Sequence, residues 1–224
     1  MKRLSITGRA AITLRRLAFQ YPNARTSLSY KTPFQFLVAV ILSAQCTDKK
    51  VNEVTKPIFA RYRTAADFAG IPLRTLEKMV HQTGFYKSKA LAIHTTAKIV
   101  RDRFENNVPR TMEELLTLRG VARKTANVVL GELYDISEGI AIDTHVMRLS
   151  RRLGFSKHHS PEQIERDLMR MISRRSWPRV TNLMIEHGRK VCEAKKPACD
   201  QCVLNDICPS AFQFEHFQKK KSRS

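Results

Sequence analysis

The segment TMEELLTLRGVARKTANVVLGEL, residues 111–133, contains two helical patterns separated by a short basic turn. The linker between TMEELLTL (111–118) and KTANVVLGEL (124–133) is too short for anything except a tight turn. Such a turn presents backbone N–H groups, and the start of the second helix adds the positive end of its dipole. Gly120 permits the close approach and the unusual φ that the turn needs. The stretch therefore predicts a helical hairpin that can seat a phosphate, with a purely structural hairpin as the alternative.

The rest of the chain also follows the helical period. Thr32 and Ser160 each precede a proline and stand three residues before a glutamine, and Thr111 begins a capping-box pattern, so all three predict helix starts. The segment FQFLVAVILSAQ (34–45) is apolar almost all round, which favours a helix at the centre of a bundle. Alternating strand patterns are nearly absent. We predict an all-α protein of about ten helices. Helical spacing is clearest at Val51, Val54, Thr55 and Ile58, at Ile93, Ala97, Val100 and Phe104, and at Val146, Leu149 and Leu153.

The charge is strongly positive. Forty Lys and Arg residues stand against 20 Asp and Glu residues in a chain of 224, which gives a net charge of +20. A globular chain this basic is expected to bind a polyanion, because each phosphate contact releases counterions. We expect nucleic acid as the partner; a membrane surface and a ribosomal or chromatin-packaging role are the alternatives. The basic tail QKKKSRS (218–224) is either a solvated end or an extension that contacts DNA.

No targeting or membrane segment is evident. The sequence has no run of 18 apolar residues, so no transmembrane helix is expected. Arg9, Arg15 and Arg16 interrupt the apolar stretches of the N-terminal segment, and no small-residue cleavage site follows, so a secretory signal is not predicted. We therefore expect an intracellular protein with reduced thiols, located in the cytoplasm or nucleoid if it is bacterial.

Four of the five cysteines lie within the short segment 192–208, with the spacing C-x6-C-x2-C-x5-C. In a reducing compartment four clustered thiols usually hold a metal centre. Composition does not separate a structural zinc ion from an iron–sulfur cluster, because both accept four thiolates. Four protein ligands leave no open position for substrate, so a structural role is expected. The fifth cysteine, Cys46, is interpreted as a buried thiol. The four clustered residues are Cys192, Cys199, Cys202 and Cys208.

Lys124 stands where the second helix of the hairpin should begin. A lysine is a nucleophile only when it is neutral, and its ordinary pKa is about 10.4. The start of a helix, partial burial and the neighbouring Arg123 all disfavour a cation there. A neutral amine can attack C1′ of a sugar and form a Schiff base. The alternative is a surface lysine that binds phosphate.

Asp143, in GIAIDTHVMRLSRRLGF (139–155), has the pattern of a helix N-cap. Ile142 and Met147 are placed as a hydrophobic staple, and Gly154 marks the far end of the helix. Capping alone would explain this aspartate. The functional alternative is that its carboxylate faces Lys124, where it could stabilise positive charge developing on a sugar or assist proton transfer.

The sequence resembles the endonuclease III family of the helix-hairpin-helix DNA glycosylase superfamily. The resemblance covers most of the chain in the family's order. It implies a [4Fe-4S] cluster at the four cysteines, a helical barrel domain over 26–136 that contains the hairpin, and an iron–sulfur cluster domain made of 1–25 and 137–224. The segments that carry it are LSAQCTDKKVN (42–52), TGFYKSKA (83–90), LRGVARKTANVVL (118–130), AIDTHVMRL (141–149), HGRKVC (187–192) and the four-cysteine signature.

The resemblance also implies roles for individual residues. Lys124 matches the family's Schiff-base lysine and Asp143 its catalytic aspartate, and Gln45 matches the residue that fills the gap left by a flipped nucleotide. Phe85 stands where the family usually has an aliphatic wedge. The hairpin departs from the family pattern, because Arg119 replaces a proline and Ala122 a glycine; an alanine held in a left-handed conformation would cost ~1–2 kcal/mol. The residues expected to contact DNA are Gln45, Phe85, Gly120, Ala122, Arg123 and His145.

The resemblance implies a bifunctional DNA glycosylase and abasic-site lyase of base excision repair, which removes damaged, oxidised pyrimidines. It would cleave the strand 3′ to the abasic site by β-elimination. Its partner would be double-stranded DNA with damaged bases or abasic sites, bound across the groove between the two domains, with no membrane involved and the protein expected to be a monomer. The alternatives are a relative specific for mismatches or pyrimidine dimers, and a non-catalytic cluster-bearing DNA-binding or redox-sensing protein. Lys124 argues against the adenine-mismatch branch, which generally lacks this lysine.

Overall fold

The computed structural model describes residues 4–217, and these form two compact units. The central unit is Thr26–Glu138, and the terminal unit combines the chain up to Arg25 with the chain from Gly139 onward. The described residues form eleven α-helices and three short 3₁₀ helices and contain no strand, which confirms the predicted all-α class. The basic tail, 218–224, lies outside the described residues.

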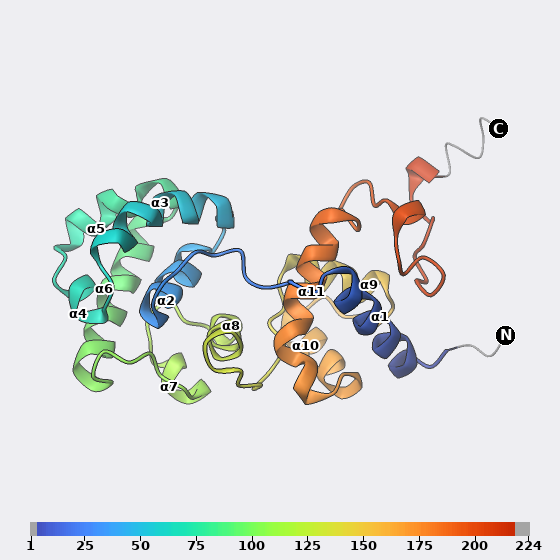
Figure 1. Cartoon of the computed structure of the whole chain (residues 1–224), viewed down its shortest axis with the longest axis horizontal. Coiled ribbons are helices and arrows are strands. Elements are labelled where there is room, and N and C mark those ends of the chain that lie inside the picture. The colour runs from blue at the N-terminus through green and yellow to red at the C-terminus, as the bar shows by residue number, and fades with distance from the viewer. Residues whose placement is uncertain (1–3, 218–224) are drawn as a thin grey trace. The chain divides into compact units, whose positions relative to one another are not determined.

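The central unit is built around α2 (Figure 1). Every residue from Phe34 to Leu42 in this helix is buried, as its apolar sequence predicts, and the helix packs against α3, α6 and α8. The helix ends at Leu42, three residues earlier than the apolar pattern suggested, and Gln45 follows with a left-handed φ of 52°. The helices of this unit are α2 (Pro33–Leu42), α3 (Asp48–Arg61), α4 (Ala65–Ala69), α5 (Leu73–Val80), η1 (His81–Thr83), α6 (Tyr86–Arg103), α7 (Met112–Leu116) and α8 (Arg123–Tyr134).

The three predicted helix starts form, although not as full capping boxes. The hydroxyls of Thr32, Thr111 and Ser160 each accept a hydrogen bond from the backbone N–H three residues later. The glutamine expected to complete the box at Thr32 has another role. Gln35 is fully buried, and its amide nitrogen donates to the carbonyls of Phe59 and Tyr62 at 2.9 Å each. It therefore caps the C-terminus of α3 from the neighbouring helix.

The terminal unit has a separate apolar core. α11 packs against α1 and against α9, and the core includes the fully buried side chains of Leu17, Leu149 and Ile164. Arg16 on α1 pairs with Asp206 near the end of the chain, with 2.5 Å between Nη1 and Oδ1. The helices of this unit are α1 (Ile6–Gln20), α9 (Thr144–Arg152), α10 (Pro161–Met171), η2 (Arg174–Ser176), α11 (Trp177–Lys190) and η3 (Cys199–Gln201).

In the part of the chain that the structure describes, every helix is too short or too polar to cross a bilayer.

Candidate active site and cysteine pocket

The hairpin between α7 and α8 depends on one glycine. Gly120 has a φ of 81°, and a Cβ built on it would lie 2.9 Å from the Cβ of Ala92 on α6. The turn is also held by Thr96, whose hydroxyl donates to the carbonyl of Arg119 at 2.9 Å. Ala122 has φ −93° and ψ 171°, which is ordinary extended backbone, so the alanine that replaces the family's glycine carries no left-handed strain.

The start of α8 is open to a ligand. Ala122 is its N-cap and makes no side-chain cap hydrogen bond, so the helix start lacks the side-chain oxygen that usually caps it. These N–H groups and the positive end of the helix dipole make a seat for an anion. Lys124 is the second residue of the helix and its side chain is exposed to solvent. The partial burial expected for Lys124 from sequence is therefore wrong.

Gln45 and Phe85 share an unusual backbone conformation. Both lie in the left-handed region, with φ of 52° and 46°, and both are exposed; Phe85 has 68% of its surface accessible. Such conformations cost free energy for residues with a Cβ and cluster at functional sites. The loop before Phe85 is held by Lys89, which is buried and donates from Nζ to the carbonyl of Thr83 at 2.7 Å. Burial lowers the pKa of Lys89.

Asp143 caps α9, as its sequence pattern predicts. Its Oδ1 accepts a hydrogen bond from the backbone N–H of Val146 at 2.8 Å. One turn later, Nη2 of Arg148 lies 3.0 Å from Nδ1 of His145 and donates to the carbonyl of Gly188 at 3.0 Å. Because a guanidinium only donates, Nδ1 accepts, so a neutral His145 carries its proton on Nε2. A Cβ on Gly188 would lie 2.7 Å from Nδ1 of His145, so only a glycine allows α9 and α11 to approach this closely.

The candidate residues therefore divide between the two units. The central unit carries Lys124 and the hairpin together with Gln45 and Phe85, and the terminal unit carries Asp143 and His145. An approach of Asp143 to Lys124 stays a proposal.

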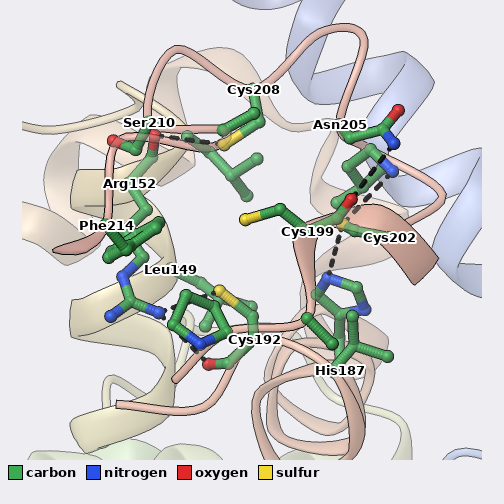
Figure 2. Close-up of a pocket in the computed structure, with 16 residues that line it drawn as sticks. Leu149, Arg152, His187, Cys192, Cys199, Cys202, Asn205, Cys208, Ser210 and Phe214 are labelled. Atoms are coloured by element: carbon green, nitrogen blue, oxygen red, sulfur yellow. Dashed lines mark hydrogen bonds between the residues drawn. The ribbon is translucent and has the colours of Figure 1, made fainter. Parts of the chain in front are cut away.

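The four clustered cysteines line one pocket of the terminal unit (Figure 2). Their side chains reach it from the end of α11, from η3 and from the loops that follow. Apolar side chains form much of the remaining lining, including Leu149, Leu153 and Phe214. Burial raises the pKa of Cys202 to about 11 and also raises the pKa of Cys208. A metal centre must therefore displace these protons when it binds, since thiolates are the ligands. The fifth cysteine, Cys46, is half-buried rather than fully buried.

The arrangement of the sulfur atoms bears on the kind of metal centre. Among residues 4–217, no three His, Cys, Asp or Glu side chains are arranged to hold a single metal ion. A zinc ion would need four sulfurs about 2.3 Å from one point. A [4Fe-4S] cluster takes one thiolate at each iron and so needs the sulfurs spread around a larger space. Four cysteines around an apolar pocket fit a cluster better than a single ion.

Arg152 holds the loop that follows the first cysteine. Its guanidinium donates to the carbonyls of Glu193 and Ala194 at 2.7 Å each, and its Nη1 lies 3.2 Å from Sγ of Cys192. It also lies over the ring of Phe214, with 4.6 Å between Cζ and the ring centroid. The exposed lysines 195 and 196 project from this loop. Sequence reasoning missed Arg152, because nothing in the sequence separates it from the adjacent Arg151, which has the same chemistry and is exposed.

A helical hairpin with an open helix start, and four cysteines around an apolar pocket, define a helix-hairpin-helix DNA repair protein with an iron–sulfur domain. Residues 38–174 match the family model of the HhH-GPD superfamily of base excision DNA repair proteins, and residues 192–208 match the iron–sulfur binding domain of endonuclease III. The chain is 50% identical over 191 residues to the endonuclease III of Synechocystis sp. The aligned residues cover 85% of this chain and 87% of that relative.

Two further comparisons agree. The chain is 38% identical over 196 residues to the endonuclease III of Bacillus subtilis, which covers 87% of this chain and 89% of the relative. It also resembles the solved structure of a trapped endonuclease III–DNA covalent intermediate, with a TM-score of 0.85, 38% identity and coverage of 96% and 98% of the two chains. The chain belongs to the endonuclease III family.

Membership confirms the resemblance, the fold class, the enzyme class and the cofactor inferred from sequence. The protein is a bifunctional DNA glycosylase and abasic-site lyase of base excision repair, and it carries a [4Fe-4S] cluster, with residues 192–208 matching the iron–sulfur binding domain. If the four clustered cysteines are its ligands, no iron has an open position for substrate, and we expect the cluster to have a structural role.

We expect replacement of Arg152 to release the cluster. Arg152→Met keeps much of the side-chain volume but removes every hydrogen bond to the loop at 193–194, so the purified protein should contain less than half of the wild-type iron and sulfide. Arg151→Met is the matched control, because it removes the same charge from the adjacent, exposed position, and its iron content should equal that of the wild type. Equal iron in both variants, measured by colorimetric iron and sulfide assays, would contradict the role assigned to Arg152.

Proposed function

We propose that the protein removes oxidised pyrimidines from double-stranded DNA and cleaves the resulting abasic site by β-elimination, with Lys124 as the nucleophile. The observation that carries this proposal is the position of Lys124, exposed in the first turn of a helix that no side chain caps. A phosphate bound by the N–H groups of that turn would bring the sugar of the same nucleotide strand within reach of the amine. Chemistry on a base in a duplex further requires that the base be extruded.

The reaction is a substitution followed by an elimination. The amine of Lys124 attacks C1′, the bond from C1′ to the base breaks, and the base leaves with the bonding electrons. The sugar ring opens to give an imine between C1′ and Nζ of Lys124. Loss of a proton from C2′ then expels the 3′ phosphate, which breaks the strand, and water finally hydrolyses the imine and frees the lysine.

We propose that Asp143 supports the charge that develops in this sequence. Its carboxylate keeps Oδ1 on the N–H of Val146, which fixes the side chain and leaves Oδ2 as the second acceptor. A fixed carboxylate near the sugar would stabilise a cationic transition state and could accept or return protons. The support for this role is the family match and the rigid cap.

The DNA contacts are assigned by exposure and conformation. Gln45 and Phe85 are strained and exposed, which suits side chains that enter the space left by an extruded nucleotide. We assign the phosphate-binding site at the hairpin to Gly120, Ala122 and Arg123, and a further phosphate contact to His145, which lies two residues after Asp143 on α9. We propose that DNA contacts both units in this way, that the protein acts as a monomer, and that it works on chromosomal DNA in the nucleoid.

The first test concerns the nucleophile. Lys124→Gln keeps much of the side-chain length but removes the amine, so borohydride trapping on DNA with an abasic site and strand cleavage should both be lost, while binding to that DNA stays within a few-fold of wild type. Lys56→Gln, which changes an exposed lysine on α3, is the control and should trap at the wild-type rate. Covalent trapping by Lys124→Gln at the wild-type rate would show that another amine is the nucleophile.

The second test separates the charge of Asp143 from its cap. Asparagine is as good an N-cap as aspartate, so Asp143→Asn should leave the thermal unfolding midpoint within a few degrees of wild type. Its rate of base release in single-turnover assays should fall by ~10²-fold or more, the scale expected for acid–base or electrostatic groups. Asp143→Ala, which loses both charge and cap, should be slow and less stable. A wild-type rate for Asp143→Asn would show that Asp143 only caps α9 and has no role in the reaction.

The third test concerns the substrate. A panel of duplexes that carry an oxidised pyrimidine, a mismatch or a pyrimidine dimer distinguishes the proposed substrate from those of the relatives that also use a lysine. We expect base release and strand cleavage to be at least 10-fold faster on the oxidised pyrimidine than on the other two. Faster cleavage of the dimer would assign the protein to the dimer-specific lyases, and binding without any cleavage would favour a non-catalytic protein.

A further inference from the structure

The segment HGRKVC, residues 187–192, contains a histidine that the proposed chemistry does not use. His187 lies on α11 with only 2% of its surface exposed. Its Nε2 lies 3.4 Å from Sγ of Cys202, a contact that Figure 2 marks with a dashed line. Its Nδ1 lies 3.1 Å from the hydroxyl oxygen of Tyr21. Tyr21 is itself buried and is the C-cap residue of α1. A hydroxyl, an imidazole and a sulfur thus form a buried chain.

The direction of the two hydrogen bonds follows from what each group can do. A cysteine that holds iron is a thiolate, which has lone pairs and no proton to give. Nε2 of the buried neutral imidazole must therefore carry the ring proton and donate it to the sulfur. Nδ1 is then an acceptor, and the hydroxyl of Tyr21 is its donor. Tyr21 in this way fixes the tautomer of His187, as second-shell partners commonly do in metal sites.

The surroundings of the four sulfurs are unequal. Within residues 4–217, side-chain N–H groups reach only the sulfurs of Cys192, from Arg152, and Cys202, from His187. The sulfur of Cys202 also faces the backbone N–H of Leu204 at 3.4 Å. Hydrogen bonds to ligand sulfurs withdraw electron density from the iron and favour its reduced state. Cys202 is therefore the ligand whose sulfur faces an imidazole, that of His187, whereas the sulfur of Cys192 faces the cationic Arg152. A hydrogen bond from His187 would change the reduction potential of the cluster.

We propose that His187 is a positioning residue that donates a hydrogen bond to the Cys202 thiolate, orients this ligand and raises the reduction potential of the iron–sulfur cluster. Tyr21 supports it by holding the donor tautomer. The proposal rests on the cluster and on contacts within the terminal unit, and it does not depend on the substrate or on Lys124.

The test compares three variants of the purified, cluster-loaded protein. His187→Met has a similar volume and no donor, so it removes the hydrogen bond while keeping the packing. His187→Gln places an amide nitrogen near the former position of Nε2 and can still donate. Tyr21→Phe keeps the ring and removes the hydroxyl, and Tyr62→Phe in the central unit is its matched control. Each variant is first checked for wild-type iron and sulfide content.

Two readouts are measured without DNA: the reduction potential of the cluster by protein-film voltammetry, and its iron–sulfur stretching frequencies by resonance Raman spectroscopy. His187→Met should have a lower potential than wild type and a higher frequency for one iron–thiolate stretch, because that bond strengthens. His187→Gln should restore most of both shifts. Tyr21→Phe should show smaller shifts in the same directions as His187→Met, and Tyr62→Phe should show none.

A purely structural role for His187 predicts a different result. His187→Met with a full cluster, the wild-type potential and the wild-type stretching frequencies would overturn the proposal. If His187→Met does not retain the cluster, Tyr21→Phe decides, because it leaves the histidine in place. Wild-type values of both readouts in a cluster-loaded Tyr21→Phe would then show that Tyr21 does not hold the donor tautomer of His187, and would overturn the proposal.

Discussion

The close contact between Gly120 and Ala92 is the constraint on which the candidate active site depends. A methyl group at position 120 would lie 2.9 Å from another methyl group, and the φ of 81° is strained for any residue with a side chain. Because the turn fits against α6, α8 begins at Arg123 without a side-chain cap at its N-cap residue and with Lys124 in its first turn. The same α6 begins at Tyr86, directly after Phe85, and packs on α2, so one helix positions the hairpin and the exposed phenylalanine.

In the terminal unit, residues distant in sequence hold four cysteines around a pocket. Arg152 from α9 fixes the carbonyls after Cys192, and His187 from α11 reaches Cys202. Gly188 lets these two helices approach each other. The short motif HGRKVC thus combines a residue that faces a ligand, a residue that permits close packing and a ligand. The cysteine pocket and α9, the helix that carries Asp143 and His145, are in this way parts of one core.

Local features were predictable from sequence, whereas contacts between distant segments were not. The cap at Asp143, the hairpin at Gly120 and the burial of α2 each follow from residues within one or two turns, and the structure contains all three. The left-handed backbones of Gln45 and Phe85 carry no glycine or asparagine signal, so no local rule reveals them. The partners of Gln35, Arg152 and His187 are distant in sequence and depend on tertiary packing. The family resemblance supplied the roles of Lys124 and Asp143, which stay predictions until the variants are measured.

The division of the terminal unit along the chain has a consequence for the order of events during synthesis. Leu17 and Arg16 of α1 leave the ribosome long before their partners in the terminal unit; Asp206, the partner of Arg16, is made 190 residues later. The central unit is continuous and can fold while translation proceeds, since domains generally fold as units as they emerge. α1 and its C-cap residue, Tyr21, can pack only after the segment that contains Asp206 has been made. Iron delivery therefore follows the synthesis of the segment up to Cys208, when both parts of the unit can meet.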